Sequence, residues 1–171
     1  DMEIVTWGLS GELEHRDSAG NEGVIYPGLA QRMSAGRGIR HSDMNHSASE
    51  PVHFLQMWVP PDTEGIDPGY EQRDLRSRFT PGAGLVAVAS GQGHDGAVHL
   101  HQAGAVMWVA HLAPGETVAV PDGDHVHVFV ARGEVTMDGR LLATGDAARL
   151  TAAGSLPLEA ETEAEVVIWE C

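Results

Sequence analysis

The stretch Gly28-Leu-Ala-Gln-Arg-Met-Ser-Ala-Gly-Arg-Gly-Ile-Arg-His-Ser-Asp-Met-Asn45 decides both the fold class and the position of a candidate site. Residues 31–35 have the composition of a strand, and Gly36-Arg-Gly38 then supplies a turn. His41 and Asp43 follow the turn. Because side chains at i and i+2 of an extended chain point to the same face, we expect His41 and Asp43 to face one interior.

This histidine and carboxylate form a candidate metal-binding pair. Imidazole nitrogen with carboxylate oxygen suits borderline divalent ions, among them Fe(II), Mn, Ni, Cu and Zn. The alternative is a surface strand whose polar face happens to carry both residues. Arg37 and Arg40 beside the pair either meet an anionic substrate or are solvated turn residues. We expect His46 to be solvated and His53 to be a hydrogen-bonded barrel histidine.

Outward from this stretch, the chain is a series of short β-branched or aromatic runs bounded by turn residues, which is typical of strands. Helical periodicity is nearly absent. Eight or more short strands, spaced about 8–12 residues apart, predict an all-β sandwich or barrel. The same order of strands and turns in the two halves predicts two β-barrels in tandem. The expected strands are 3–7, 12–16, 23–26, 31–35, 52–59, 85–90, 98–101, 106–112, 117–120, 126–131, 135–137, 148–150 and 165–169.

The best domain boundary lies where Pro, Gly and charged residues interrupt the strand pattern. Residues 60–84 have this composition, with a short turn of helix expected near Tyr70 to Arg76. We therefore predict an N-terminal domain at 1–62, a linker at 63–84 and a C-terminal domain at 85–171.

Composition excludes several classes of partner. The formal net charge of the 171 residues is -15, which opposes binding to nucleic acid or to an anionic membrane surface. No apolar run approaches the roughly 20 residues that span a bilayer. The single cysteine, Cys171, allows no disulfide within one chain, so we expect a reducing compartment and a cytoplasmic location.

Five ordered segments in the first 75 residues resemble the pirin family, and the second half resembles its C-terminal domain more loosely through its strand pattern and His101-Gln102. The resemblance implies an all-β protein with two cupin (jelly-roll) barrels in tandem. It also implies one non-haem metal, usually iron, in the N-terminal barrel and a C-terminal cupin free of metal. The segments are 1–7, 11–18, 31–42, 51–59 and 69–73.

The resemblance also implies a set of site residues. The family's metal ligands are a His-x-His pair and a His-x-Glu pair, and the second pair maps onto His41 and Asp43. The first pair would precede Asp1, so we expect the first cupin to be incomplete at its N-terminus. Asp43 is one methylene shorter than the family's Glu, which leaves three roles open: ligation, ligation through water, or a place outside the metal's ligands. Glu3 is expected near the metal, orienting a ligand or acting as an acid or base.

The function implied is that of a metal-dependent dioxygenase of the quercetin 2,3-dioxygenase type, acting on a flavonol- or catechol-like molecule with O₂. Asp43 and Glu3 are the candidate catalytic residues, and His41 and Asp43 the candidate metal ligands. Two alternatives are a non-enzymatic metal- or redox-responsive regulatory protein and a degenerate cupin scaffold. Because missing strands would leave sheet edges unpaired, we also expect a homo-oligomer, an exchanged strand or a retained N-terminal peptide.

Overall fold

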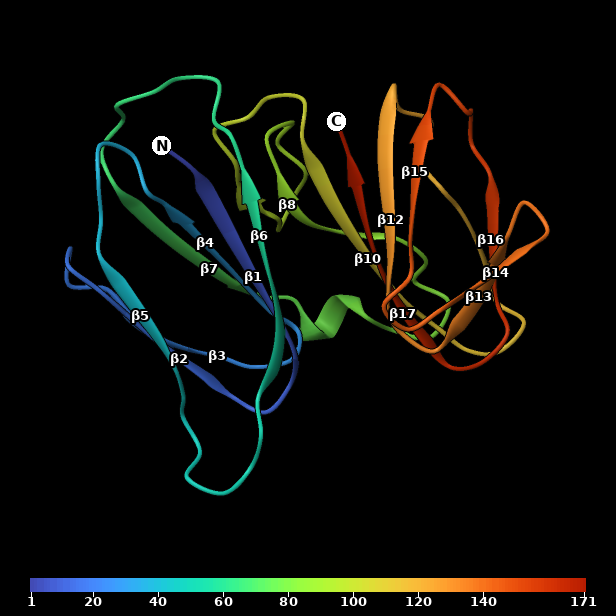
Figure 1. Cartoon of the computed structure of the whole chain (residues 1–171), viewed down its shortest axis with the longest axis horizontal. Helices are drawn as coiled ribbons and strands as arrows, with labels where there is room; N and C mark the ends of the chain where they lie inside the picture. Colours follow the sequence, from blue (N-terminus) through green and yellow to red (C-terminus); the bar gives the residue numbers. More distant parts are fainter. The chain divides into compact units, whose positions relative to one another are not determined.

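The computed structural model describes all 171 residues, and nearly all of its regular structure is β-strand (Figure 1). The predicted all-β class is confirmed. The one helical element is a short 3₁₀ turn, Arg76–Arg78. None of the chain's helices has the length and apolar character needed to cross a membrane.

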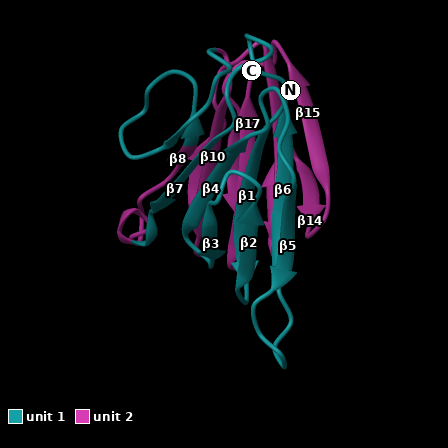
Figure 2. Cartoon of the chain, turned by 90° about the vertical axis from the view of Figure 1, so that its left-hand side faces the viewer, with its two compact units in different colours: residues 1–76, 89–103 teal, residues 77–88, 104–171 magenta.

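The chain folds into two compact units, and neither is continuous in sequence (Figure 2). Unit 1 comprises Asp1–Arg76 and Ala89–Ala103, and unit 2 comprises Ser77–Val88 and Gly104–Cys171. These ranges differ from the predicted boundaries because the chain returns to unit 1 after its first passage through unit 2. Strand β8 (Val86–Ser90) carries the chain across this return, and in unit 1 its Ala89 and Ser90 pair with β9 (Val98–His99).

Apart from the parallel pairing of Ala89 and Ser90 with β9, the strands of unit 1 form two antiparallel sheets. The first has the strand order β6-β1-β4-β7 and the second the order β3-β2-β5. A small cluster of Leu13, Ile25 and Leu29 lies in its core, with Tyr26, Val52 and Phe54 packed against it. The strands are β1 Glu3–Ser10, β2 Leu13–Asp17, β3 Glu22–Ile25, β4 Leu29–Ser34, β5 His41–Asn45, β6 His53–Val59 and β7 Gly69–Asp74.

Strand β7 corrects the expected helical turn near Tyr70 to Arg76. Tyr70 and Gln72 lie opposite Met33 and Gln31 of β4 in an antiparallel ladder, so this polar segment is extended. No residue of β7 is fully buried, so its sequence shows no clear alternation of apolar and polar residues. The pairing with β4, rather than local propensity, defines this strand.

Unit 2 also has two antiparallel arrays, in the orders β15-β12-β17-β10 and β11-β16-β13-β14. Alternate residues Val126, Val128 and Val130 of β12 are buried in its apolar core, as strand periodicity requires. The strands are β10 Val106–Leu112, β11 Thr117–Ala119, β12 His125–Arg132, β13 Glu134–Met137, β14 Arg140–Ala143, β15 Ala147–Thr151, β16 Pro157–Ala160 and β17 Ala164–Glu170.

The turn between β4 and β5 sets the position of the candidate site. Gly36 has φ +48°, and a Cβ there would collide with the backbone of Ile66 and Asp67. Glycine is therefore required at this point for two separate reasons, backbone conformation and space. The turn delivers His41 to the first position of β5.

Candidate metal-binding site

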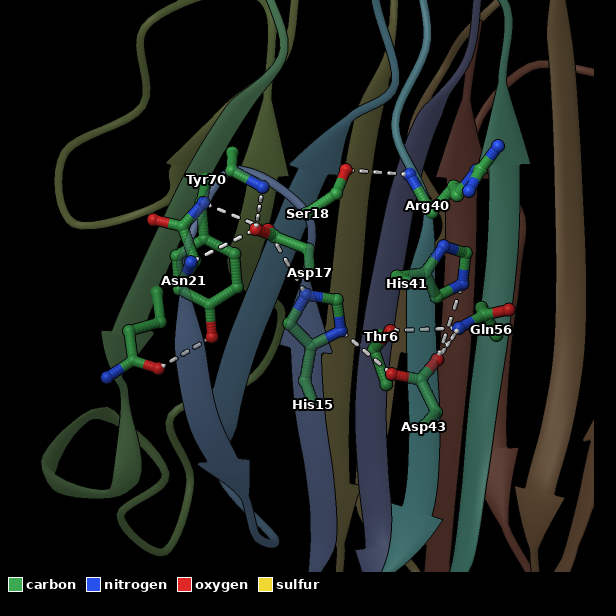
Figure 3. A network of polar contacts seen from close by, with 12 residues as sticks. Thr6, His15, Asp17, Ser18, Asn21, Arg40, His41, Asp43, Gln56 and Tyr70 are labelled. Carbon is green, nitrogen blue, oxygen red and sulfur yellow. Dashed lines mark hydrogen bonds and ion pairs between the residues drawn. The ribbon is translucent and has the colours of Figure 1, made fainter.

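Two His-x-Asp segments face each other across the β2–β5 ladder. The register places His15 opposite Asp43 and Asp17 opposite His41. Since residues two apart share a face, all four side chains lie on the same side of the ladder, in an alternating arrangement that Figure 3 shows. The structure therefore brings the predicted pair, His41 and Asp43, together and adds two residues to it.

Both carboxylate oxygens of Asp43 accept hydrogen bonds. Its Oδ1 accepts a hydrogen bond from Nδ1 of His15 at 2.8 Å, and its Oδ2 accepts one from Nε2 of Gln56 at 2.9 Å. Nε2 of His41 lies 3.7 Å from the same Oδ2. Burial works to raise the pKa of Asp43, but the hydrogen bonds from His15 and Gln56, with the nearby histidine charges, lower it below its ordinary value. Asp43 is therefore a carboxylate at neutral pH.

His15 lies at the centre of the group and is almost completely buried. Its ring stacks against Tyr70 with the ring centroids 5.3 Å apart, and against His41 at 5.8 Å. Its Nε2 faces Oδ2 of Asp17 at 3.5 Å. Burial lowers the pKa of His15, but hydrogen bonds and charge from Asp43 and Asp17 outweigh burial and raise it above its ordinary value.

A row of polar side chains on the other sheet continues the site. Gln56, Thr6, Gln31 and Gln72 lie directly opposite one another across β6, β1, β4 and β7. Gln56 joins the two sheets, because its Nε2 reaches Asp43 and also lies 3.5 Å from Oγ1 of Thr6. The space between the sheets is thus polar at this level.

Glu3 is placed elsewhere in unit 1. It is fully buried on β1, three residues from Thr6 and therefore on the opposite face of the strand. Its Oε2 accepts hydrogen bonds from the backbone N–H and from Nδ1 of His101, and lies 3.9 Å from Nε of Arg32. The structure does not bring Glu3 to His41 and Asp43, and its acid–base role stays a prediction.

The other polar residues of the predicted site lie at the surface. Arg37 is exposed and pairs with Asp67 at 2.5 Å, and the exposed Arg40 uses its backbone N–H to bond Oγ of Ser18. His46 is solvated, as expected, with Nδ1 3.1 Å from Oε2 of Glu14. The expectation of a barrel histidine at His53 is wrong, because His53 is exposed at the start of β6.

Family comparison identifies the chain. A model of the Pirin family matches residues 1–59, and a model described as the quercetinase C-terminal cupin domain matches residues 87–171. A Mycobacterium tuberculosis protein provisionally named a quercetin 2,3-dioxygenase is 55% identical over 172 residues, which cover 99% of this chain and 70% of the relative. The chain belongs to the pirin family. The predicted resemblance is confirmed.

Relatives with more specific names and solved structures agree with this assignment. The quercetin 2,3-dioxygenase of Escherichia coli K12 is 36% identical to this pirin-family chain, over 99% of the chain and 72% of the relative. The crystal structure of YhhW from Escherichia coli has a TM-score of 0.88 at 35% identity, over 99% of this chain and 71% of that one. A YhhW complex with nickel(II) has a TM-score of 0.87 at 34% identity, with 99% and 72% covered. The predicted tandem cupin fold is confirmed.

The family implies a metal, and the residue types of the site fit one. Nε2 of His41 and Oδ2 of Asp43 are 3.7 Å apart, whereas two ligand atoms at ~2.1 Å from one ion lie roughly 3.0–3.4 Å apart. A small side-chain movement would bring them to that separation, and the nitrogen and oxygen donors suit a borderline divalent ion. Together they offer two donor atoms, and their role as metal ligands stays a prediction. The chain contains no group of three or more His, Cys, Asp or Glu residues arranged to hold a metal ion.

Sequence reasoning missed His15 and Gln56. His15-Arg-Asp17 repeats the His-x-Asp spacing of His41-Ser-Asp43, and that repetition was the available signal. The repetition could not by itself show that the two segments pair antiparallel, with each histidine opposite the aspartate of the other segment. A cleft of about 690 Å³ in unit 2 has no part in this site, since none of its lining residues belongs to it.

Proposed function

We propose that this pirin-family chain is a metal-dependent dioxygenase that acts on a flavonol- or catechol-like molecule with O₂. The observation that carries the proposal is the pairing of His41 with Asp43 on the inner face of β5, supported from behind by His15 and Gln56. The names of the 36% identical Escherichia coli relative and of the more similar mycobacterial relative favour the same activity. Iron is the proposed metal, and the nickel(II) complex of YhhW makes nickel the first alternative.

In this proposal, His41 and Asp43 hold the metal, and the polar row of β6, β1 and β4 borders the space for the substrate. The bound ion supplies a Lewis-acid and redox centre for the reaction of an aromatic hydroxyl compound with O₂. The lowered pKa of Asp43 suits a ligand, because a carboxylate that stays ionised at neutral pH remains available to a cation. The same shift makes Asp43 a weak general base.

The proposal is tested by oxygen uptake. Full-length protein loaded with Fe(II), and separately with Ni(II), is mixed with quercetin and with catechol in an oxygen-electrode cell. We expect His41→Ala and Asp43→Ala each to lower the rate by at least about 100-fold, since each removes a ligand. His53→Ala is the matched control, because this histidine is exposed on β6 and should leave the rate unchanged.

The other outcomes separate the alternatives. Metal binding without oxygen uptake would support a metal- or redox-responsive binding protein. Failure to bind either metal would support a scaffold that has lost the metal. Undiminished oxygen uptake by the His41→Ala variant would show that the activity arises elsewhere.

A further inference from the structure

We infer that His15 is a positioning residue that fixes the Asp43 carboxylate in the orientation needed to bind the metal. The inference rests on the proposed function, because it takes Asp43 to be a ligand. It goes beyond that proposal by assigning a role to a buried histidine on another strand, 28 residues away in sequence.

The contacts of His15 leave its ring a single orientation. The ring is 1% exposed and lies against Tyr70 and His41. Nδ1 is 2.8 Å from Oδ1 of Asp43, and Nε2 is 3.5 Å from Oδ2 of Asp17. Turning the ring over would replace both of these nitrogens by carbon atoms and leave two carboxylates without their partner.

Asp17 is itself anchored by the hairpin turn that follows β2. Its Oδ1 accepts backbone hydrogen bonds from Ala19 at 2.9 Å and from Asn21 at 3.0 Å, and its Oδ2 accepts one from the Asn21 amide at 2.9 Å. A chain of contacts therefore runs from a rigid turn through Asp17 and His15 to Asp43 (Figure 3). Asp43 therefore depends for its orientation on residues of another strand, β2, and of the turn that follows it.

This support acts on the rotation of the Asp43 carboxylate. Asp43 can present an oxygen to a metal only if its carboxylate stays in one rotational position about the Cβ–Cγ bond. His15 holds one oxygen and Gln56 the other, so both are needed to fix that rotation. Loss of a hydrogen-bond partner behind a ligand typically weakens metal binding by about 10–100-fold.

The test compares two substitutions of the same shape. Leucine and asparagine have the same heavy-atom outline, and the asparagine Nδ2 is bonded to Cγ just as Nδ1 of histidine is. His15→Asn therefore keeps a donor toward Asp43, and His15→Leu removes it. We expect His15→Leu to raise the Kd for Ni(II) by about 10–100-fold. We expect His15→Asn to stay within roughly threefold of the wild type, because the donor behind the ligand is retained.

Two further readouts separate positioning from folding. The Ni(II)-loaded visible absorption spectrum should change in His15→Leu and be restored in His15→Asn, because the spectrum reports ligand geometry. Thermal unfolding without metal checks that each variant is folded. If His15→Leu does not fold, His15→Gln takes its place, since its amide nitrogen lies one bond further out and no longer meets Asp43; it should bind Ni(II) weakly.

The failures of the two proposals give different results. If Asp43→Ala and His41→Ala leave Ni(II) affinity unchanged, the proposed metal site is wrong and the role of His15 is overturned with it. If those two variants lose Ni(II) while His15→Leu, or its glutamine substitute, binds like the wild type, the site stands and only the inference about His15 is overturned. Equal weakening by leucine and asparagine overturns it as well, because the donor would then not matter.

Discussion

Single buried charges in unit 1 are each matched to a particular partner, and Arg32 is the clearest case. Its Nε donates to the carbonyl of His99 at 2.8 Å, its Nη1 to Oγ of Ser34 at 2.9 Å, and its Nη2 to Oε2 of Glu71 at 3.2 Å. Glu71 also accepts the His99 backbone N–H at 2.9 Å. Removing one member of such a group leaves a buried donor or acceptor of its neighbour unpaired.

Glu71 gives a pH-dependent prediction. Burial raises the pKa of Glu71, but the His99 N–H, Arg73 and the charge of Arg32 together lower it below its ordinary value of 4.5. Its stabilising contribution is therefore complete above about pH 4.5 and is lost as the pH falls through the lower folded-state pKa. We expect Glu71→Gln to cost about 1–2 kcal/mol at about pH 7 and much less at about pH 3. Urea unfolding at the two pH values measures this.

A matched control is Glu22→Gln, since Glu22 is largely exposed and lies 4.0 Å from Arg16. It should change the free energy of unfolding little at either pH. A cost for Glu71→Gln that does not shrink in acid would contradict the assignment of its charge as the source of the stability.

At this scale, the sequence could predict contacts that follow from local spacing and could not predict those that depend on strand register. His41 and Asp43 were accessible because an i, i+2 pair shares a face whatever the strand pairs with. The contact of His15 with Asp43 depends on how β2 aligns with β5, and a shift of one residue would remove it. Glu3 was placed by family resemblance, and its position on the other face of β1 from Thr6 required the structure.

Among the elements, the turn between β4 and β5 has little room for a side chain at Gly36. Gly36 and Gly65 both have positive φ, +48° and +71°, but only Gly36 has backbone atoms where a Cβ would stand. We expect Gly65→Ala to cost about 1 kcal/mol for its conformation. Gly36→Ala should cost clearly more, because the turn must also move away from Ile66. Chemical unfolding of both variants measures the difference, and equal costs would show that the collision is relieved without strain.

Elements with a dense apolar pattern were predictable, and elements defined by their partners were not. Strand β10 coincides with its predicted range, 106–112, because apolar residues occupy nearly every position. The sequence predicts a helical turn where β7 lies, since the polar side chains of this strand carry little periodic signal and its extended form comes from pairing with β4. Strands β14 and β16 were not predicted at all, although β16 alternates buried and exposed residues over Pro157–Ala160.

For the whole molecule, charge is the dominant property that composition alone supplies. A formal net charge of -15 over 171 residues implies mutual repulsion in the folded state. We expect Tm to rise by a few degrees between about 50 mM and about 500 mM NaCl, because salt screens that repulsion. The rise should disappear near the pH at which the net charge is zero. A fall in Tm at neutral pH would mean instead that attractive ion pairs, such as Arg32 with Glu71, outweigh the repulsion.

The return of the chain to unit 1 has a consequence for protein synthesis. Glu3 and Arg32 emerge early from the ribosome, yet their partners His101 and His99 are made only after residues 77–88 of the other unit. At about 5–20 residues per second, the interval between Arg32 and His99 is on the order of 3–13 s. During that time the nascent first unit lacks the two histidines that later bond Glu3 and Arg32. A gene cut between residues 84 and 85 would therefore not yield two autonomous halves, because the first would end before the segment that completes it.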